Sequence, residues 1–441
     1  MLSSRGKQYA EVTGYPWRYA PRQTYDREKN PDGLISLAIA ENLIMRPQIA
    51  KFINEKVKFT ESAISYGPKP LLVPRLLTAL SSHFNKFFSP SVPVTPEHIV
   101  TAVDATSIGS ILGLTLADPG DAVLVSRPIY GRFELDYGLE AGVNILYADT
   151  DAKSAFEESV VERFEEALVN FESQNKGRRV RAVLLANPNN PVGKPYPRST
   201  LQKILRFCSK HNLHLISDEV YALCTFDTAI EGTEHVPFTS VLSLLDDPTI
   251  NPELVHVLYG FSKDFASGGL CLGFLITRNE QLRKAVFPLL RFHNTSGAAL
   301  QIATAILEDE KFVEGFVETT RSELARSYRF VTRVLEEEGI EYVRGGNAGF
   351  FVYINLSPFL QQTSGILNDS GNVLSSEART YNDKQGTDQE IDLAQRLLDG
   401  NVVLHPGEEH NRQPGWFRLV FSQSEEVLSV ALRRLVNVLK G

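Results

Sequence analysis

The chain has 441 residues, of which 43% are hydrophobic, 22% charged and 10% aromatic. This composition is typical of a globular protein and excludes collagen-like, low-complexity and disordered chains. The net charge is −8 and the basic residues are scattered, so we expect no nucleic-acid partner, because phosphate backbones require a basic stripe. The longest apolar run, residues 107–117, is shorter than the roughly 18 residues that cross a bilayer, so no membrane partner is expected either.

The cysteine content indicates a reducing compartment. The three cysteines, Cys208, Cys224 and Cys271, have neither the number of a disulfide framework nor the spacing of metal ligands. Residues 1–17 also lack the apolar segment of a secretory signal. We therefore expect a cytoplasmic protein without a metal site.

In chain order, short apolar segments alternate with amphipathic ones from about residue 120 to residue 292. Strands are expected at 122–126, 143–147, 181–186, 213–217, 255–259 and 272–276, and helices at 161–174, 199–211 and 279–292. Continuous apolar strands separated by helices predict an α/β fold, with a doubly wound and mostly parallel sheet that is covered by helices on both faces.

The pattern changes after about Phe312 and predicts a smaller α+β C-terminal domain. A charged helix is expected at 314–338, followed by an apolar segment at 349–355, a second one at 416–421 and an amphipathic helix at 424–439. Residues 358–389 are rich in polar residues and glycine, which indicates a solvated insertion. The domain prediction is a large domain at 91–311, a small domain at 312–441, and an N-terminal segment, 1–90, that contributes to the small domain.

Polar residues follow several of the expected strands, where ligands bind in open α/β sheets. They are Ser126-Arg127-Pro128-Ile129-Tyr130, Asn187-Pro188-Asn189-Asn190-Pro191-Val192-Gly193, Asp218-Glu219-Val220-Tyr221 and Gly260-Phe261-Ser262-Lys263-Asp264. Each motif alone has an ordinary explanation, since Asn-Pro favours tight loops and Asp often caps a helix. A lysine, an aspartate, an asparagine and a tyrosine at successive strand ends nevertheless form a set with one chemical use.

This set resembles the fold-type I pyridoxal 5'-phosphate (PLP) enzymes of the class I/II aminotransferase superfamily. Within them it is most similar to 1-aminocyclopropane-1-carboxylate (ACC) synthase-like proteins of the kind found in fungal specialised metabolism. The resemblance runs from about Asn30 to the C-terminus, apart from the insertion. Beyond the strand-end motifs it rests on Asn30-Pro31-Asp32-Gly33, Ala40-Glu41-Asn42, Ala117-Asp118-Pro119-Gly120-Asp121 and Gly415-Trp416-Phe417-Arg418. It implies a fold-type I PLP transferase fold and PLP as the cofactor.

The resemblance assigns the catalytic and ring-binding residues. Lys263 would form the Schiff base with PLP and later move the Cα proton, a role that suits an amine because desolvation lowers its pKa. Asp218 would pair with the pyridinium nitrogen and keep it protonated. Asn190 and Tyr221 would hydrogen-bond the phenolic oxygen, and Tyr130 would stack on the ring.

The resemblance also assigns two substrate-binding residues in addition to Asn190. Arg418 would hold the substrate carboxylate with a bidentate fork, the alternative being a surface ion pair. Glu41 matches an acidic residue that ACC synthases place near the substrate amino group and side chain, the alternative being a helix cap or surface glutamate. A carboxylate there suits a cationic or sulfur-bearing substrate.

The phosphate of PLP is expected to bind at the start of a helix. Ala105 and Thr106 match the phosphate loop of the family, where free backbone N–H groups favour an anion, and Ser262 joins the cofactor-binding set. Tyr66 matches a tyrosine that reaches the phosphate of the neighbouring subunit. The resemblance therefore implies a homodimer with shared active sites, in which residues 1–90 contribute to the interface.

Two phosphate-binding residues of the family are replaced in this chain. The serine three residues before the lysine is Gly260, and the arginine eight residues after it is Cys271. Each lost charge-assisted partner costs about 1.5–3 kcal/mol, or roughly tenfold to a hundredfold in affinity. Ser107 and Ser267 are candidates to compensate, and Cys271 itself is expected to be a small buried apolar residue rather than a reactive thiol.

The favoured reaction starts from an α-amino acid, passes through an external aldimine and a Cα carbanion, and eliminates or replaces a group beyond Cα. S-adenosylmethionine and sulfur-conjugated amino acids are the candidate substrates. Against strict ACC synthase activity, Leu135, Gly138 and Glu140 occupy the stretch where plant members carry arginines. The main alternative is an aminotransferase that passes the α-amino group to a 2-oxo acid.

Two further classes remain as lesser alternatives. A non-catalytic homologue with the PLP fold would explain the altered phosphate residues, but the intact Lys263, Asp218, Asn190, Tyr221 and Arg418 argue against it. A dehydrogenase-like nucleotide-binding protein would require Gly-x-Gly-x-x-Gly after its first strand, and the sequence has none there.

Overall fold

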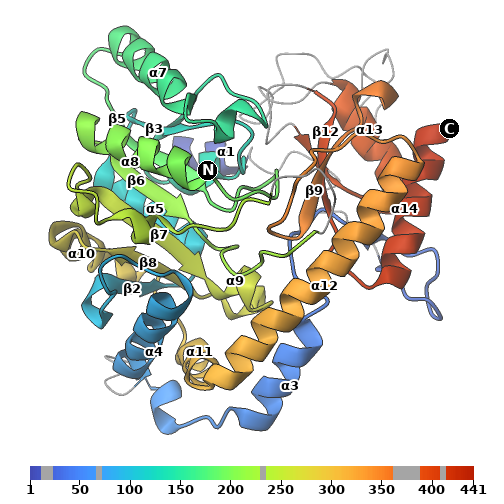
Figure 1. The fold of residues 1–441 in the computed structure, drawn as a ribbon, viewed down its shortest axis with the longest axis horizontal. Coiled ribbons are helices and arrows are strands. Elements are labelled where there is room, and N and C mark those ends of the chain that lie inside the picture. The colour runs from blue at the N-terminus through green and yellow to red at the C-terminus, as the bar shows by residue number, and fades with distance from the viewer. Residues whose placement is uncertain (11–22, 66–71, 229–234, 361–387, 408–413) are drawn as a thin grey trace. The chain divides into compact units, whose positions relative to one another are not determined.

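The computed structural model of the chain describes residues 1–10, 23–65, 72–228, 235–360, 388–407 and 414–441 (Figure 1). The chain forms two compact units. The larger unit contains residues 41–326 and 345–350, and the smaller unit contains residues 1–40, 327–344 and 351–441. Residues 41–90, which the sequence analysis places in an N-terminal segment, therefore group with the larger unit.

The larger unit contains a seven-stranded sheet with the order β2-β8-β7-β6-β5-β3-β4. Only β8 is antiparallel to its neighbours, so the other six strands share one direction. The strands are β2 (Ile99–Ala102), β3 (Ala122–Val125), β4 (Asn144–Tyr147), β5 (Val180–Ala186), β6 (His214–Asp218), β7 (Val255–Gly260) and β8 (Gly273–Thr277). All six predicted strands belong to this sheet, and the predicted mostly parallel arrangement is confirmed.

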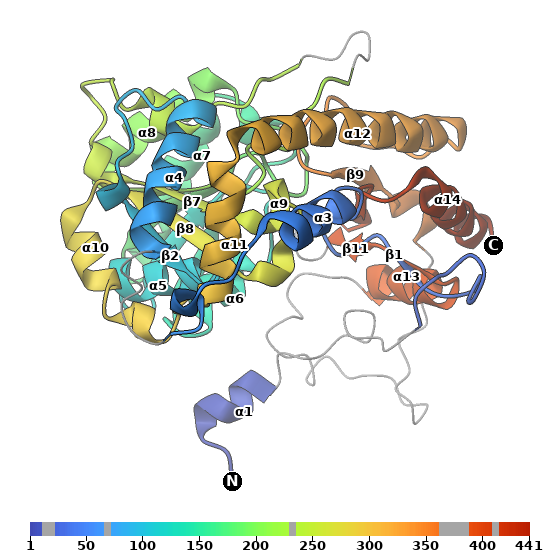
Figure 2. The ribbon, with the colours of Figure 1, turned by 90° about the horizontal axis from the view of Figure 1, so that it is seen from below.

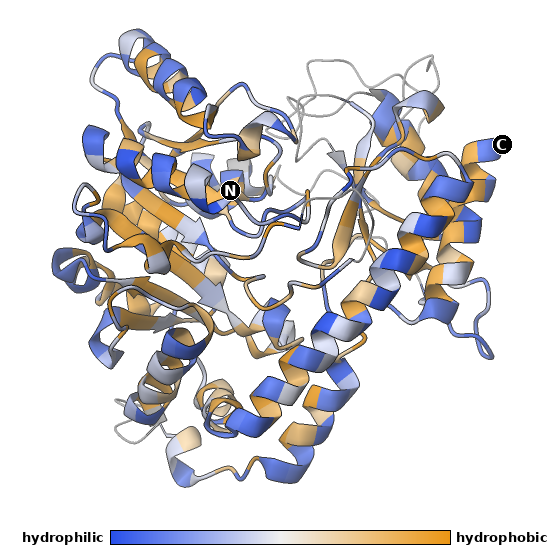
Figure 3. Cartoon of the chain, in the orientation of Figure 1, coloured by the Kyte–Doolittle hydropathy of each residue, from blue (hydrophilic) through white to orange (hydrophobic). Residues whose placement is uncertain are grey.

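Most residues of the central strands are apolar because both faces of the sheet are buried there. In β3, Ala122 and Leu124 belong to one hydrophobic core, whereas Val123 and Val125 belong to another. Figure 3 shows the same pattern as orange strands beneath helices that carry hydrophilic residues on their outer sides. Strands that alternate between two cores have no polar face, which explains their continuous apolar sequences.

Helices cover the two faces of this sheet (Figures 1 and 2). The core of one face includes α5 (Ala105–Leu116), α6 (Phe133–Gly138) and α10 (Glu280–Val286). The core of the other face includes α3 (Arg46–Lys56), α4 (Leu72–Phe87), α7 (Val160–Gln174), α8 (Arg198–His211) and α11 (Gly297–Glu308).

One predicted helix is shorter than the sequence analysis expects. The helix predicted at 279–292 ends at Val286 and is followed by a 3-10 turn, Leu289–Arg291. Pro288 explains this end, because proline lacks the backbone N–H that a continuing helix would use, although Phe287 before it keeps helical backbone angles. The other four predicted helices are present as α7, α8, α12 (Glu310–Glu337) and α14 (Glu425–Lys440).

The smaller unit is an α+β assembly. Its strands β9 (Phe351–Asn355), β12 (Trp416–Val420) and β11 (His405–Pro406) form an antiparallel sheet, and β1 (Ile35–Ser36) pairs in parallel with β10 (Val402–Val403). Its helices are α1 (Ser4–Ala10), α13 (Asp388–Asp399), α14 (Glu425–Lys440) and the end of α12 (Glu310–Glu337). Of the predicted insertion, residues 361–387 lie outside the described residues.

Candidate functional site

The topology of the larger unit brings the predicted strand-end residues to one edge of the sheet. Strands β2, β5, β6 and β7 end at this edge, and the antiparallel β8 begins there. In the register, Ala102 pairs with Gly273 and Gly273 with Gly260, while Asp218 pairs with Ala186. The segments that follow these strands therefore form one surface, which we call the carboxyl edge.

Lys263, Asp218 and Tyr221 lie together at the carboxyl edge. Lys263 is on the short helix α9 (Phe261–Asp264), and its Nζ is 5.9 Å from the centroid of the Tyr221 ring. Burial raises the pKa of Asp218 to about 6, against the opposing effects of the Val220 N–H and the Lys263 charge. The charge of Lys263 thus acts on the Asp218 carboxyl group, which fits one site formed by the segments after β6 and β7.

The Asn-Pro loop after β5 is fixed by the side chains of two asparagines. The Asn187 N–H donates to the Asp218 carbonyl oxygen at 2.8 Å, and its side-chain amide donates to Thr239 O at 2.9 Å. The Asn189 amide donates to Pro128 O at 3.2 Å, which joins this loop to the segment after β3. Asn190, 5% exposed, is held within this framework.

Tyr130 lies in the segment after β3 that Asn189 contacts. Its ring packs edge-to-face on Phe133, with centroids 5.3 Å apart and an interplanar angle of 89°. Tyr130 is half-buried. The predicted aromatic residue is therefore supported by α6 on one side and belongs to a segment that is fastened to the asparagine loop.

Asp264, which was not predicted from the sequence, anchors α9. Its carboxyl oxygens accept the N–H groups of Leu223 and Cys224 at 3.0 and 3.2 Å, and the Tyr259 hydroxyl at 3.0 Å. Burial raises the pKa of Asp264 to about 7, and these hydrogen bonds oppose the rise. The network ties the Lys263 turn to the segment that carries Tyr221. No local pattern reveals it, because the backbone donors are about 40 residues away.

Glu219 is a second buried carboxyl group that was not predicted. Its Oε1 accepts the Ser217 hydroxyl at 3.0 Å and the Val241 N–H at 2.9 Å, whereas Oε2 has no hydrogen-bond partner among the described residues. Burial raises its pKa to about 8. Two adjacent carboxyl groups thus differ, because Asp218 interacts with a cation and Glu219 is held as a neutral acid at pH 7.

The predicted phosphate-binding pair, Ala105 and Thr106, begins α5 at the carboxyl edge. The residue before it, Asp104, is the N-cap of this helix, and its Oδ1 accepts the Ser107 N–H at 2.7 Å. The sequence analysis missed Asp104, although an aspartate just before an apolar helical run is the usual signature of an N-cap.

The two replaced phosphate residues also lie at this edge. Gly260 is buried, and a Cβ there would lie 3.0 Å from the Leu272 carbonyl oxygen. Cys271 is exposed, so the prediction of a buried apolar residue is wrong. It ends a 3-10 turn at φ +48°, and this left-handed corner leaves its side chain on the surface. Of the two candidate compensating serines, Ser267 instead donates its hydroxyl to Phe265 O at 2.7 Å.

Glu41 lies close to α9, as its predicted role requires. Its Oε1 is 3.7 Å from the position that a Cβ of Gly268 would occupy, and the Cβ of Ser262 is 3.9 Å from the same position. Glu41 also accepts a hydrogen bond from the Arg46 guanidinium at 2.6 Å, and both side chains are about half exposed. The carboxylate is thus near α9, the short helix that carries Lys263, and is part of an ion pair with Arg46.

Arg418 belongs to the smaller unit and is described there. It is 3% exposed, its Nη2 donates to Ala38 O at 2.7 Å, and its guanidinium lies 5.6 Å from the Phe351 ring centroid. This burial excludes the alternative of a surface ion pair. Tyr66 lies outside the described residues, so the expectation of shared sites stays a prediction.

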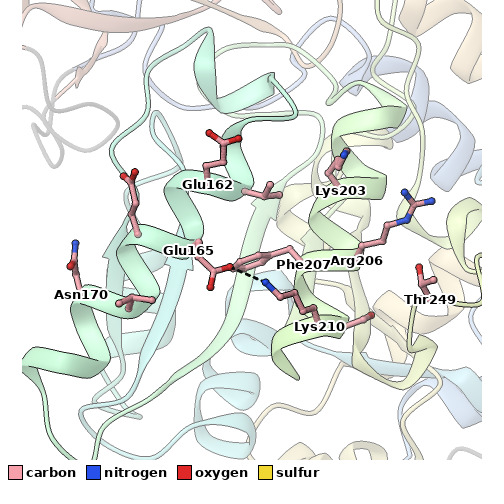
Figure 4. A pocket seen from close by; sticks show the side chains of 12 residues that line it. Glu162, Glu165, Asn170, Lys203, Arg206, Phe207, Lys210 and Thr249 are labelled. Atoms are coloured by element: carbon pink, nitrogen blue, oxygen red, sulfur yellow. Dashed lines mark hydrogen bonds and ion pairs between the residues drawn. The ribbon is translucent and has the colours of Figure 1, made fainter.

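A groove of about 1030 Å³ is present elsewhere, between α7 and α8 (Figure 4). Its lining contains none of the predicted site residues, and its charges are engaged locally: Glu165 pairs with Lys210 at 3.5 Å and Arg206 with Asp247 at 2.7 Å. Val169 and Phe207 form part of its wall. We therefore assign the candidate site to the carboxyl edge and not to this groove.

Within the described parts of the chain, no group of three or more histidine, cysteine, aspartate or glutamate residues is placed to hold a metal ion. No described helix is long and apolar enough to cross a membrane.

Known proteins resemble this chain in sequence and in fold. The model of the family "Aminotransferase class I and II" matches residues 34–435. A double mutant of the Thermus thermophilus aspartate aminotransferase has a TM-score of 0.71 and 22% identity, with 99% of each chain covered. The Thermotoga maritima aspartate aminotransferase has a TM-score of 0.64 and 22% identity, with 92% of each chain covered.

Curated relatives share more of the sequence. Mouse ACC synthase-like protein 1 is 30% identical, covering 100% of this chain and 83% of its own. ACC synthase of Nicotiana tabacum is 28% identical, covering 95% of this chain and 82% of its own. A mouse protein named "probable inactive" ACC synthase-like protein 2 is 29% identical, covering 94% of this chain and 67% of its own.

Proposed function

From the premise that the chain belongs to the aminotransferase class I and II family and uses PLP, we propose that it eliminates or replaces a group beyond Cα of an α-amino acid. The substrate class is an amino acid with a sulfonium or another sulfur-linked leaving group. ACC synthases and ACC synthase-like proteins among the relatives support this choice.

The residues at the carboxyl edge fit the ring of PLP. Lys263 offers an amine for the cofactor aldehyde, and Asp218 offers a buried carboxyl group, whose pKa the charge of Lys263 lowers, for the pyridinium nitrogen. Asn190 and Tyr221 offer hydrogen-bond donors for the phenolic oxygen, and Tyr130 offers an aromatic face. When bound, PLP supplies an electron sink for the pair released at Cα. Lys263 would then move the Cα proton, and Arg418 would bind and orient the substrate carboxylate.

The position of Glu41 is the single observation that carries the choice of reaction. Its carboxylate lies beside Gly268 and Ser262, next to the lysine turn, where it attracts a cationic leaving group. A positive sulfonium is such a group. An aminotransferase releases no cationic leaving group, so its reaction does not require an acidic residue at this position.

The ion pair between Glu41 and Arg46 favours the alternative, an aminotransferase. A carboxylate that already accepts the Arg46 guanidinium at 2.6 Å has part of its charge neutralised. If this pair persists during turnover, Glu41 is structural, and the site only has to move the amino group.

Product analysis distinguishes the two reactions. The full chain with PLP is incubated with S-adenosylmethionine, cysteine conjugates and ordinary amino acids, with and without a 2-oxo acid. We expect release of methylthioadenosine or a thiol without any requirement for the 2-oxo acid, and loss of this release in Lys263→Ala but not in the surface control Lys284→Ala. Amino transfer to the 2-oxo acid without a leaving group would overturn the elimination proposal.

We further propose a cytoplasmic homodimer whose two sites are completed by Tyr66 from each neighbouring subunit. The three free cysteines support a reducing compartment. Light scattering of the purified chain tests the assembly, and an equimolar mixture of Lys263→Ala and Tyr66→Ala chains tests the sharing. Shared sites predict partial recovery of activity in refolded mixtures, because one kind of site then receives both intact residues.

A further inference from the structure

The N-terminus of α5 carries a negative charge where the resemblance places the phosphate of PLP. The first turn of a helix presents free N–H groups that bind anions. Here Asp104 extends its own carboxylate over this turn and accepts the Ser107 N–H at 2.7 Å. A group that occupies a helix N-terminus competes with any other anion for the same donors.

The backbone around Asp104 is closely packed against β8. A Cβ on Gly273 would lie 2.4 Å from the Asp104 carbonyl carbon and 2.8 Å from the Ala105 nitrogen. The pairing of Ala102 with Gly273, and of Gly273 with Gly260, continues this packing to the lysine turn. The backbone of Asp104 is therefore held against β8, and the hydrogen bond from the Ser107 N–H fixes its carboxylate at the carboxyl edge.

The charged groups near Asp104 only partly compensate the negative charge of a phosphate. Burial and the charges of Asp218 and Asp104 raise the pKa of Asp136 to about 7, with Arg132 opposing them. Asp136 lies beside α5, since a Cβ on Gly109 would be 3.3 Å from its own Cβ. Asp104, Asp136 and Asp218 thus share this region with Arg132 and Lys263, and the exposed Cys271 stands where the family has an arginine.

We propose that Asp104 determines the vitamer selectivity of the chain by weakening the binding of the phosphorylated cofactor relative to unphosphorylated pyridoxal. This inference rests on the proposed function, because it concerns the same cofactor. The ring contacts of Lys263 and Asp218 are common to both vitamers, so they set the shared affinity. Asp104 acts only on the phosphate dianion, through competition for the Ser107 N–H and through like-charge repulsion.

The test measures dissociation constants of PLP and of pyridoxal for the full chain by titrating the absorption of the bound cofactor. Asp104→Asn removes the charge and keeps an N-cap of equal quality. We expect it to bind PLP about tenfold more tightly, corresponding to about 1.4 kcal/mol, and to bind pyridoxal unchanged. Cys271→Arg should also strengthen PLP binding alone, because it adds a cation near the same group.

Asp151→Asn is the matched control, since Asp151 accepts the Lys153 and Ser154 N–H groups at 2.8 Å in an exposed turn. It should change neither constant. Asp104→Ser, which also caps a helix, repeats the test if the asparagine variant folds poorly. If wild type and both Asp104 variants bind both vitamers with the same ratio of the PLP and pyridoxal dissociation constants, this inference is overturned and the proposed function is not. No binding of either vitamer by any folded variant would overturn the proposed function as well.

Discussion

Polar side chains are buried at both of the edges where the strands of the seven-stranded sheet begin and end. The two edges differ in how completely these side chains are hydrogen-bonded. At the edge opposite the candidate site, His214 Nδ1 contacts His256 Nε2 at 2.8 Å, and His256 Nδ1 contacts the Thr277 hydroxyl at 2.8 Å. Burial lowers the pKa of His214 to about 4 and that of His256 well below its ordinary value. His214, His256 and Thr277 thus form a hydrogen-bonded network of neutral groups, and the charge of Arg181 further lowers the pKa of His214.

The carboxyl edge instead buries acids whose pKa values are raised. The pKa values of Asp218, Asp264 and Glu219 are about 6, 7 and 8. Glu219 keeps an oxygen without a hydrogen-bond partner among the described residues, and the charge of Lys263 lowers the pKa of Asp218 against the effect of burial. Buried groups that are left incomplete within the chain are what a ligand completes, so the contrast separates a stabilising network from a site for chemistry.

The largest expected effect comes from the adjacent pair Asp218 and Glu219. Asp218→Ala should lower the rate of product formation by about 10²–10³-fold, as for the loss of one preorganised polar contact. Glu219→Gln should lower it less than about threefold, because the group that it replaces is a neutral hydrogen-bonded acid. Steady-state rates of both variants with saturating PLP check this. Equal losses would place both residues in the same structural role.

Asp264→Ala should reduce stability more than any change in the histidine network. It removes the acceptor of two backbone N–H groups and of the Tyr259 hydroxyl, and unpaired buried donors make the expected loss about 3 kcal/mol. Urea unfolding measures the free energy of unfolding. Asp264→Asn keeps one acceptor oxygen and should lose less than the alanine variant; an equal loss would show that burial of the residue, rather than its contacts, matters.

The fold could be predicted from the sequence because its strongest signal is local. Continuous apolar strands revealed six strands and the α/β class, whereas β2 escaped because Ile99–Ala102 is short and only partly buried. The break of the predicted helix at 279–292 was present in the sequence as Pro288. The sheet order and the antiparallel direction of β8 depend on contacts between distant strands, which no local pattern contains.

The site residues likewise divide into those that local sequence patterns predict and those that depend on distant contacts. Lys263, Asp218, Asn190 and Tyr221 were predicted to share a site because the carboxyl ends of parallel strands meet. Asp264 was missed because its backbone donors lie far away in the sequence. The exposure of Cys271 was predicted wrongly because it depends on a left-handed corner that composition does not indicate.

The histidine network should make stability fall in acid. The pKa of His256 is lowered on folding from its ordinary value of 6.5, so below this pH the unfolded chain binds a proton that the folded chain does not. The histidine then removes about 1.4 kcal/mol of stability per pH unit. The stability deficit of His256→Gln relative to wild type should therefore shrink by about 2 kcal/mol between pH 6.5 and 5. Thr277→Val, which breaks the network without a titrating group, should keep a constant deficit, and urea unfolding at both pH values measures each.

Glu219 should show the opposite sign and the smallest effect. Its pKa is raised on folding from 4.5 to about 8, so between these values the folded chain holds a proton that the unfolded chain has lost. Stability from this group is complete below pH 4.5 and is lost as the pH rises through 8. Between pH 6 and 7, Glu219→Gln should gain about 1.4 kcal/mol relative to wild type. A difference that stays constant over this interval in urea unfolding would mean that Glu219 is ionised in the folded chain, and the carboxyl edge would then carry one more negative charge against the phosphate of PLP.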